Sequence, residues 1–204
     1  MAHHPMETFK FYLEMGLKHV LDLNGYDHLL FLAALALPFA LKKVKQAVYL
    51  ASVFTLTHCL SLSLSVYEIA KVYAPLIEFL IPLSILMLLG LNIKNAQKNT
   101  GPKTGFIVYT ATAIFGLVHG FGFSNYFKML IAGQEEKLTA LVGFASGIEL
   151  AQLAVLLSVI LASAFLIAIF KIQRARWVLV FSSALAVMTL PLVYKSFTAL
   201  IYAL

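Results

Sequence analysis

Residues 138–170 read LTALVGFASGIELAQLAVLLSVILASAFLIAIF, and this stretch decides the class of fold. It contains a single charged side chain, Glu149. A helix of about 20 apolar residues is long enough to cross the hydrocarbon core of a bilayer. The stretch is therefore predicted to span a membrane. Its excess length leaves two alternatives, one long tilted helix or a re-entrant piece followed by a span.

The rest of the chain has the same apolar character. Of 204 residues, 61% are hydrophobic and 12% charged, and the mean hydropathy is +0.91. A soluble domain carries about 25% charged residues. This composition excludes a soluble enzyme, a nucleic-acid-binding protein and a secreted disulfide-bonded module as the main interpretation. The single cysteine, Cys59, has no second cysteine with which to form an internal disulfide.

Six apolar runs predict an all-α, polytopic membrane helix bundle in which residues 1–204 form one integral membrane domain. The predicted spans are 26–41, 47–67, 72–93, 104–123, 138–170 and 177–194, with an apolar tail to residue 204. Residues 9–23 carry a charge at almost every turn and are predicted to form an interfacial helix on the outer face. Asn24 and Gly25 supply a turn before the first span. No functional role is assigned to His3 and His4.

Basic residues predict the orientation of the spans. They gather in the first, third and fifth loops, as Lys42, Lys43 and Lys45, then Lys94, Lys98 and Lys103, then Lys171, Arg174 and Arg176. Cytoplasmic loops are enriched in Lys and Arg, so the odd-numbered loops are predicted to face the cytoplasm from a bacterial inner membrane. Both termini then face outward, unless the apolar tail crosses again. The net charge of +6 thus reflects topology rather than nucleic-acid binding.

Ionisable side chains inside the predicted spans define the candidate site. Each costs about 2.5–3.5 kcal/mol on insertion scales, so each is expected to have a partner or a function. A rise of about 1.5 Å per residue puts all of them in the outer half of the membrane. They are Asp27, His28, His58, Glu78, His119 and Glu149, and the turn at 24–25 brings His19 close to them. Glu78 is equally well explained by a surface pair with Lys71.

Imidazole nitrogen and carboxylate oxygen are ligands of zinc, nickel, cobalt and ferrous iron. The sequence therefore predicts an outward-facing cavity that binds one of these divalent transition metals. Taken singly, His58 or His119 is as well explained by packing against a neighbouring helix. Cys59 points about 100° away from His58 around the helix and is a poor co-ligand. Ser61 shares the face of His58 and is placed to hydrogen-bond its second ring nitrogen.

Five blocks of the sequence resemble the HupE/UreJ family of small bacterial membrane proteins. They are GLKHVLDLNGYDHLLFLAALAL, FTLTHCLSLSLS, IEFLIPLSILMLLGLN, FGLVHGFGFS and GFASGIELAQL, in the family's order between residues 16 and 153. The resemblance implies a permease-like protein of six or seven helices, often linked to nickel supply for hydrogenase or urease. It also implies that the residues that matter are His19, Asp27, His28, His58, His119 and Glu149, with Glu78 and Asn92 in a second rank.

Two functions remain in view. In a divalent metal permease, Asp27, His28 and His119 capture an ion and pass it toward His58 and Glu149. In a zinc-dependent intramembrane hydrolase, three histidines hold zinc, and Asp27 or Glu149 is the general base acting on a lipid or lipidated substrate. A metal sensor or storage protein is a third alternative. The expected partners are a metal ion and the lipid bilayer, with a homo-oligomer left open and no nucleic acid.

The permease hypothesis has one weakness at this level. No comparable series of polar residues marks a route through the inner half of the membrane. Asn92 and Lys195 are too few for one, and the topology puts Lys195 toward the outside.

Overall fold

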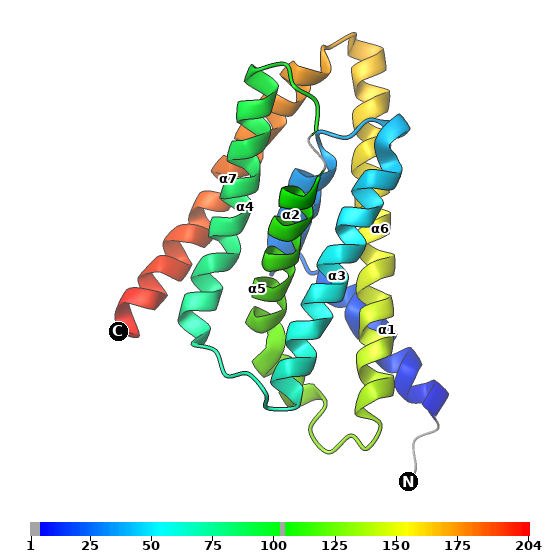
Figure 1. Cartoon of the computed structure of the whole chain (residues 1–204), viewed down its shortest axis with the longest axis vertical. Coiled ribbons are helices and arrows are strands. Elements are labelled where there is room, and N and C mark those ends of the chain that lie inside the picture. Colours follow the sequence, from blue (N-terminus) through cyan, green and yellow to red (C-terminus); the bar gives the residue numbers. More distant parts are fainter. Residues whose placement is uncertain (1–4, 103–104) are drawn as a thin grey trace.

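The computed structural model describes residues 5–102 and 105–204, and these residues form an all-helical bundle (Figure 1). Its helices are α1 (Pro5–Val20), α2 (Asp27–Ala36), α3 (Val44–Val66), α4 (Ala74–Gln97), α5 (Phe106–Leu130), α6 (Lys137–Phe170) and α7 (Arg174–Tyr202), with a short 3-10 turn at Leu41–Lys43. The predicted all-α class is confirmed. His3, His4, Lys103 and the first residue of the predicted 104–123 span lie outside the described residues.

Five helices, α3 to α7, are long and apolar enough to cross a membrane. The protein is therefore an integral membrane protein. Helix α6 is a single helix of 34 residues, about 51 Å long, which decides between the two alternatives left open for 138–170. The apolar tail after the predicted last span belongs to α7, which continues through Pro191 to Tyr202.

The first predicted span, 26–41, corresponds to a much shorter helix. Helix α2 has ten residues and is about 15 Å long, half the roughly 30 Å of a hydrocarbon core. It ends just before Pro38, because proline has no backbone N–H to continue the helical hydrogen bonds. Helices α1 and α2 run in the same direction, α1 in the lower half of the bundle and α2 above it (Figure 1). Helices α1 and α2 together therefore extend along the bundle in the direction that a single membrane-spanning helix would follow.

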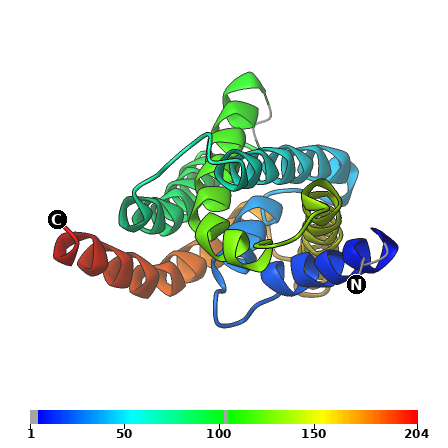
Figure 2. The same ribbon diagram turned by 90° about the horizontal axis from the view of Figure 1, so that it is seen from below.

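Helix α1 packs along the first half of α6 and lies beside it when the bundle is viewed from below (Figure 2). Glycines permit this close approach. A Cβ added at Gly143 would lie 2.6 Å from the backbone oxygen of Phe9, and one at Gly147 would clash with the backbone oxygen of Leu13. The last turn of α1 is thereby held inside the bundle. The placement of α1 at the membrane surface stays a prediction.

Helices α3 and α5 pack equally closely. A Cβ at Gly116 of α5 would lie 2.6 Å from the backbone oxygen of Phe54, and one at Gly120 would clash with the backbone oxygen of His58. The sequence motif around His119 therefore acts through backbone contact, as small residues do between membrane helices. It brings the two histidine-bearing turns of α3 and α5 side by side.

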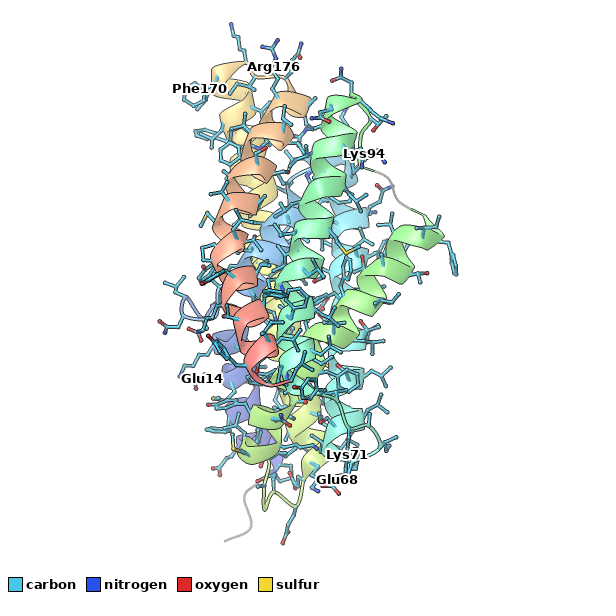
Figure 3. All side chains as sticks on the ribbon, turned by 90° about the vertical axis from the view of Figure 1, so that its left-hand side faces the viewer. Glu14, Glu68, Lys71, Lys94, Phe170 and Arg176 are labelled. Atoms are coloured by element: carbon cyan, nitrogen blue, oxygen red, sulfur yellow. The ribbon has the colours of Figure 1, made fainter. Side chains whose placement is uncertain are left out.

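The charged residues are divided between the two ends of the bundle. The loops from α2 to α3, α4 to α5 and α6 to α7 lie at one end (Figure 1), and Figure 3 shows Lys94 and Arg176 there and Glu68 at the other end. These three loops and the adjoining helix ends hold nine of the 15 basic residues and none of the nine acidic ones. We call this end the basic end and the opposite one the acidic end. The alternation matches the predicted topology, while the side of the membrane stays a prediction.

Substitution of Gly120 by valine is expected to destabilise the bundle, because the new side chain has to displace the backbone of α3. Overpacking of this kind costs about 1–3 kcal/mol. The matched control is Gly90→Ala in α4, where a Cβ meets no atom within 4 Å. Helix propensity then favours alanine by about 0.5–1 kcal/mol. Thermal unfolding in detergent measures both changes. A Gly120→Val variant as stable as the parent would show that the close contact is not needed.

Candidate metal centre

Three histidines from three different helices converge in the bundle. His19 lies in the last turn of α1, His28 in the first turn of α2 and His58 in α3. One ligand atom from each lies within 4.8 Å of the other two. The ring centroids of His19 and His28 are 4.5 Å apart, because the short link between α1 and α2 joins the turns that carry them. This is the geometry from which a metal site is built, with ligands from separate elements.

His119 of α5 completes what we call the histidine cluster, namely His19, His28, His58 and His119. Its ring centroid lies 5.6 Å from that of His28. The side chains of His28, His58 and His119 are buried, and His19 is half-buried. The predicted meeting of these four histidines is thus present in the structure.

Five ring nitrogens of the cluster lack hydrogen-bond partners among the described residues. The unpartnered buried atoms are Nε2 of His19, His28 and His119, and both Nδ1 and Nε2 of His58. Buried polar atoms in proteins are nearly always hydrogen-bonded, since desolvating one without a partner costs free energy. Five such atoms in one place indicate a site whose partner is a ligand. Imidazole nitrogens are preferred ligands of transition-metal ions, so the cluster could hold such an ion.

Two of the imidazoles are held with Nε2 free for a metal. Nδ1 of His28 donates to Oδ1 of Asp27 over 3.2 Å, and the same oxygen accepts a 2.9 Å bond from the backbone N–H of His28. Nδ1 of His119 donates to the backbone oxygen of Phe115 over 2.8 Å. A histidine that donates through Nδ1 keeps its lone pair on Nε2, and a carboxylate partner makes it a stronger ligand. Asp27 therefore acts on the site through His28.

Glu149 lies in a different polar group, between α3 and α6. Its carboxylate accepts hydrogen bonds from the Ser52 hydroxyl (2.6 Å), the Thr55 hydroxyl (2.5 Å) and the Gln152 amide (2.7 Å). Gln152 also donates to Thr55 and to the backbone oxygen of Ala51. Among the described residues, Glu149 is not in the metal-binding group. Sequence reasoning missed Gln152, although it lies three residues after Glu149 on one helix face.

The second-rank residues have separate surroundings. Glu78 lines, with Asp27 and Lys195, a cavity of about 280 Å³ between α2, α4 and α7. The side-chain amide of Asn92 donates to the backbone oxygen of Ala34 over 2.7 Å and so fixes the end of α2. Neither residue belongs to the histidine cluster.

Ser61 does not take the partner that the sequence suggested. Its hydroxyl donates to the backbone oxygen of His58 over 2.8 Å, and not to the ring. A hydroxyl in a membrane helix commonly bonds to the preceding turn of its own helix. Both ring nitrogens of His58 thus remain available.

His19 connects the cluster to the surface near the acidic end. It lines a cavity of about 840 Å³ together with Glu14, Lys18, Asp22 and the aromatic rings of Phe123 and Tyr126. Glu14 projects from the outer side of α1 (Figure 3) and forms a 2.6 Å ion pair with Lys18. Phe123 covers His19, with ring centroids 3.8 Å apart. Of the four histidines of the cluster, His19 is thus the one that lines this cavity, and the other three are buried.

The comparisons with known proteins agree with this description. A family model described as HupE / UreJ protein matches residues 1–198. No curated protein and no solved structure gives a significant match.

The site makes a quantitative prediction about Asp27. Asp27→Asn retains the shape of the side chain and removes the charge that orients His28, so the affinity for Ni²⁺, Co²⁺ or Zn²⁺ should fall about 10- to 100-fold. Equilibrium dialysis of the purified protein in detergent measures this. Glu78→Gln, a neighbouring acid outside the cluster, should bind as the parent does. Undiminished binding by a variant with His28, His58 and His119 all changed to alanine would remove the cluster as the metal site.

Proposed function

The chain belongs to the HupE/UreJ family, and on that basis we propose that it is a permease for a divalent transition metal, with nickel as the first candidate. One observation carries the proposal. Four histidines from four helices bring unpartnered ring nitrogens together inside a membrane protein, behind a cavity that opens near the acidic end. The resemblance to nickel-supply proteins makes Ni²⁺ the first metal to test, and Co²⁺ and Zn²⁺ share its preference for imidazole.

The ligand set suits reversible binding. Four neutral imidazoles leave the charge of a divalent ion uncompensated except for Asp27, which lies behind His28. In a low-dielectric interior this residual charge opposes permanent retention. A set of thiolates or several carboxylates would hold the ion more firmly. The site is thus adapted to pick up an ion and release it.

The charge distribution supports a direction for metal transport across the membrane. All nine acidic residues lie outside the basic end, and Glu14 and Asp22 line the cavity that leads to His19. Acidic side chains raise the local concentration of cations. We propose that the basic end faces the cytoplasm of a bacterium, as the excess of Lys and Arg in its loops favours, and that metal enters from the outside.

The order of the residues suggests how an ion is taken up. Glu14 and Asp22 attract it, His19 exchanges with part of its hydration shell, and His28, His58 and His119 complete its binding inside. The break between the two short helices α1 and α2 lies next to the histidine cluster. Transporters often bind a substrate within the membrane at such a break between helices. Glu149 accepts hydrogen bonds from residues on α3 and α6. It is proposed as a separate contact that the ion makes later on the route.

A zinc-dependent intramembrane hydrolase remains the second candidate, because three histidines within 4.8 Å match a catalytic zinc site with one open position. Its general base would be Asp27 or Glu149. Asp27 is hydrogen-bonded to His28 and Glu149 to Ser52, Thr55 and Gln152. Both carboxylates are therefore engaged in hydrogen bonds within the protein, which favours transport.

Purified protein in liposomes should carry Ni²⁺ to a chelating dye trapped inside. His28→Ala combined with His58→Ala should reduce the initial rate about tenfold or more, because two ligands of one ion are lost together. Ser146→Ala is the control, since this serine lies on an exposed face of α6 and bonds only to its own helix. Zinc that survives dialysis, together with cleavage of a lipid and no ion movement, would instead establish the hydrolase.

The proposed orientation is testable by thiol labelling. In a Cys59→Ala background, Lys43→Cys marks the basic end and Glu68→Cys the acidic end. A membrane-impermeant maleimide added to intact spheroplasts should label Glu68→Cys alone, and permeabilisation should expose Lys43→Cys. Labelling of Lys43→Cys alone in intact spheroplasts would reverse the proposed orientation.

A further inference from the structure

We propose that Phe31 and Phe54 form a gate on the basic-end side of the histidine cluster, and that a second cavity beyond them is where the metal leaves. This inference rests on the proposed permease function. It supplies the inner half of the route, for which the sequence offered no series of polar residues.

The two phenylalanines lie directly against the cluster. Phe31 follows His28 by three residues on α2, which runs toward the basic end, and Phe54 precedes His58 by four on α3, which starts there. Their rings stack with centroids 4.5 Å apart and an interplanar angle of 26°. The centroid of the His119 ring lies 5.3 Å from that of Phe31 and 5.1 Å from that of Phe54. Both phenylalanines are 1% exposed, so the stacked pair closes this side of the cluster.

A second apolar layer lies one turn farther toward the basic end. Leu35 follows Phe31 on α2, and Leu50 precedes Phe54 on α3, and both are buried. These two leucines also line a cavity of about 570 Å³ that is bounded by α4 and the start of α5. Asn92, Lys94 and Asn95 supply polar groups to its wall. Along the bundle axis the order is histidine cluster, phenylalanine pair, leucine pair, cavity.

The two sides of the cluster therefore differ. Toward the acidic end, His19 itself lines a cavity. Toward the basic end, two apolar layers of about one helical turn each separate the ligands from the next cavity. An apolar constriction blocks ions because it cannot replace their hydration. The structure thus brings a cavity closer to the cluster on the acidic-end side than on the basic-end side.

Helix α2 is the element that can open this gate. It carries both His28 and Phe31, so one displacement changes the ligand set and separates the stacked rings. Two side chains hold its far end. Asn92 donates to the backbone oxygen of Ala34 over 2.7 Å, and Arg174 donates to that of Phe39 over 2.9 Å. Phe31, His28 and the two anchored backbone oxygens all belong to one short segment, residues 28–39.

Buried aromatic pairs are common in ordinary cores, so the test needs a matched aromatic residue. Phe127 serves, because it is fully buried and packs against Phe144, with ring centroids 4.7 Å apart, in the core near the acidic end. Truncating Phe127 to alanine removes the volume of one of the two gate side chains and leaves the proposed gate intact.

The experiment measures passive Ni²⁺ leak in the liposomes, with no imposed pH or voltage gradient. Phe31→Ala with Phe54→Ala should raise the leak about tenfold or more, since the layer next to the cluster no longer excludes water. Phe127→Ala should leave it unchanged, and dialysis should find Ni²⁺ bound in both variants. An unchanged leak in the double variant, or an equal rise in Phe127→Ala, would overturn the gate.

A second measurement requires no transport and separates failure of the gate from failure of the permease. In the Cys59→Ala background, Leu50→Cys lies at the proposed exit cavity and Ser61→Cys lies beyond the gate, next to His58. An impermeant methanethiosulfonate applied from the basic end should modify Leu50→Cys and not Ser61→Cys. Adding Phe31→Ala and Phe54→Ala should make Ser61→Cys reactive from that end. Reaction of Ser61→Cys from that end with both phenylalanines intact would show that no barrier exists there.

Discussion

The constraint on which the rest of this structure depends is the burial of four imidazoles without hydrogen-bond partners for their metal-facing nitrogens. Such atoms are costly to bury in an apolar bundle. Close helix packing compensates for part of that cost, and the backbone contacts of Gly120 with α3 and of Gly147 with α1 hold the histidine-bearing turns in place. A cation bound by the cluster would satisfy the same nitrogens. Stability and ion binding are therefore linked at this site, since a ligand that binds only the folded state stabilises it.

The bundle is polarised in both charge and access. Acidic residues and the cavity that reaches His19 occupy one end, while the other carries basic loops and is separated from the cluster by stacked phenylalanine rings. For the proposed permease these two asymmetries reinforce one another, because acidic side chains concentrate cations where the cavity reaches His19. Alternating access would then require a shift of α2, a helix of ten residues, relative to α3. The ligand His28 and the barrier residue Phe31 move together in such a shift.

Much of this was predictable from the residues. The membrane class follows from apolar runs, and the alternation of loops follows from the positions of Lys and Arg. His28, His58 and His119 stand out because ionisable groups are rare in spans, and the turn at 24–25 brings His19 to them. Glu149 stands out for the same reason, yet the structure surrounds it with Ser52, Thr55 and Gln152. Rarity identifies a residue as important without indicating its neighbours. The length of α2 was overestimated because the apolar run continues past the point where Pro38 ends the helix.

The sequence by itself determined the helical membrane architecture, the division of charge and the identity of the site histidines, because these depend on composition and spacing along the chain. Only the tertiary structure decided which atoms meet. It showed Asp27 bonded to the ring of His28, Glu149 held apart from the cluster, and two phenylalanines stacked between the ligands and a second cavity. These contacts join residues of different helices or depend on a side-chain rotamer. Neither hydropathy nor periodicity records them, because both report the faces of a helix and not the distances between helices.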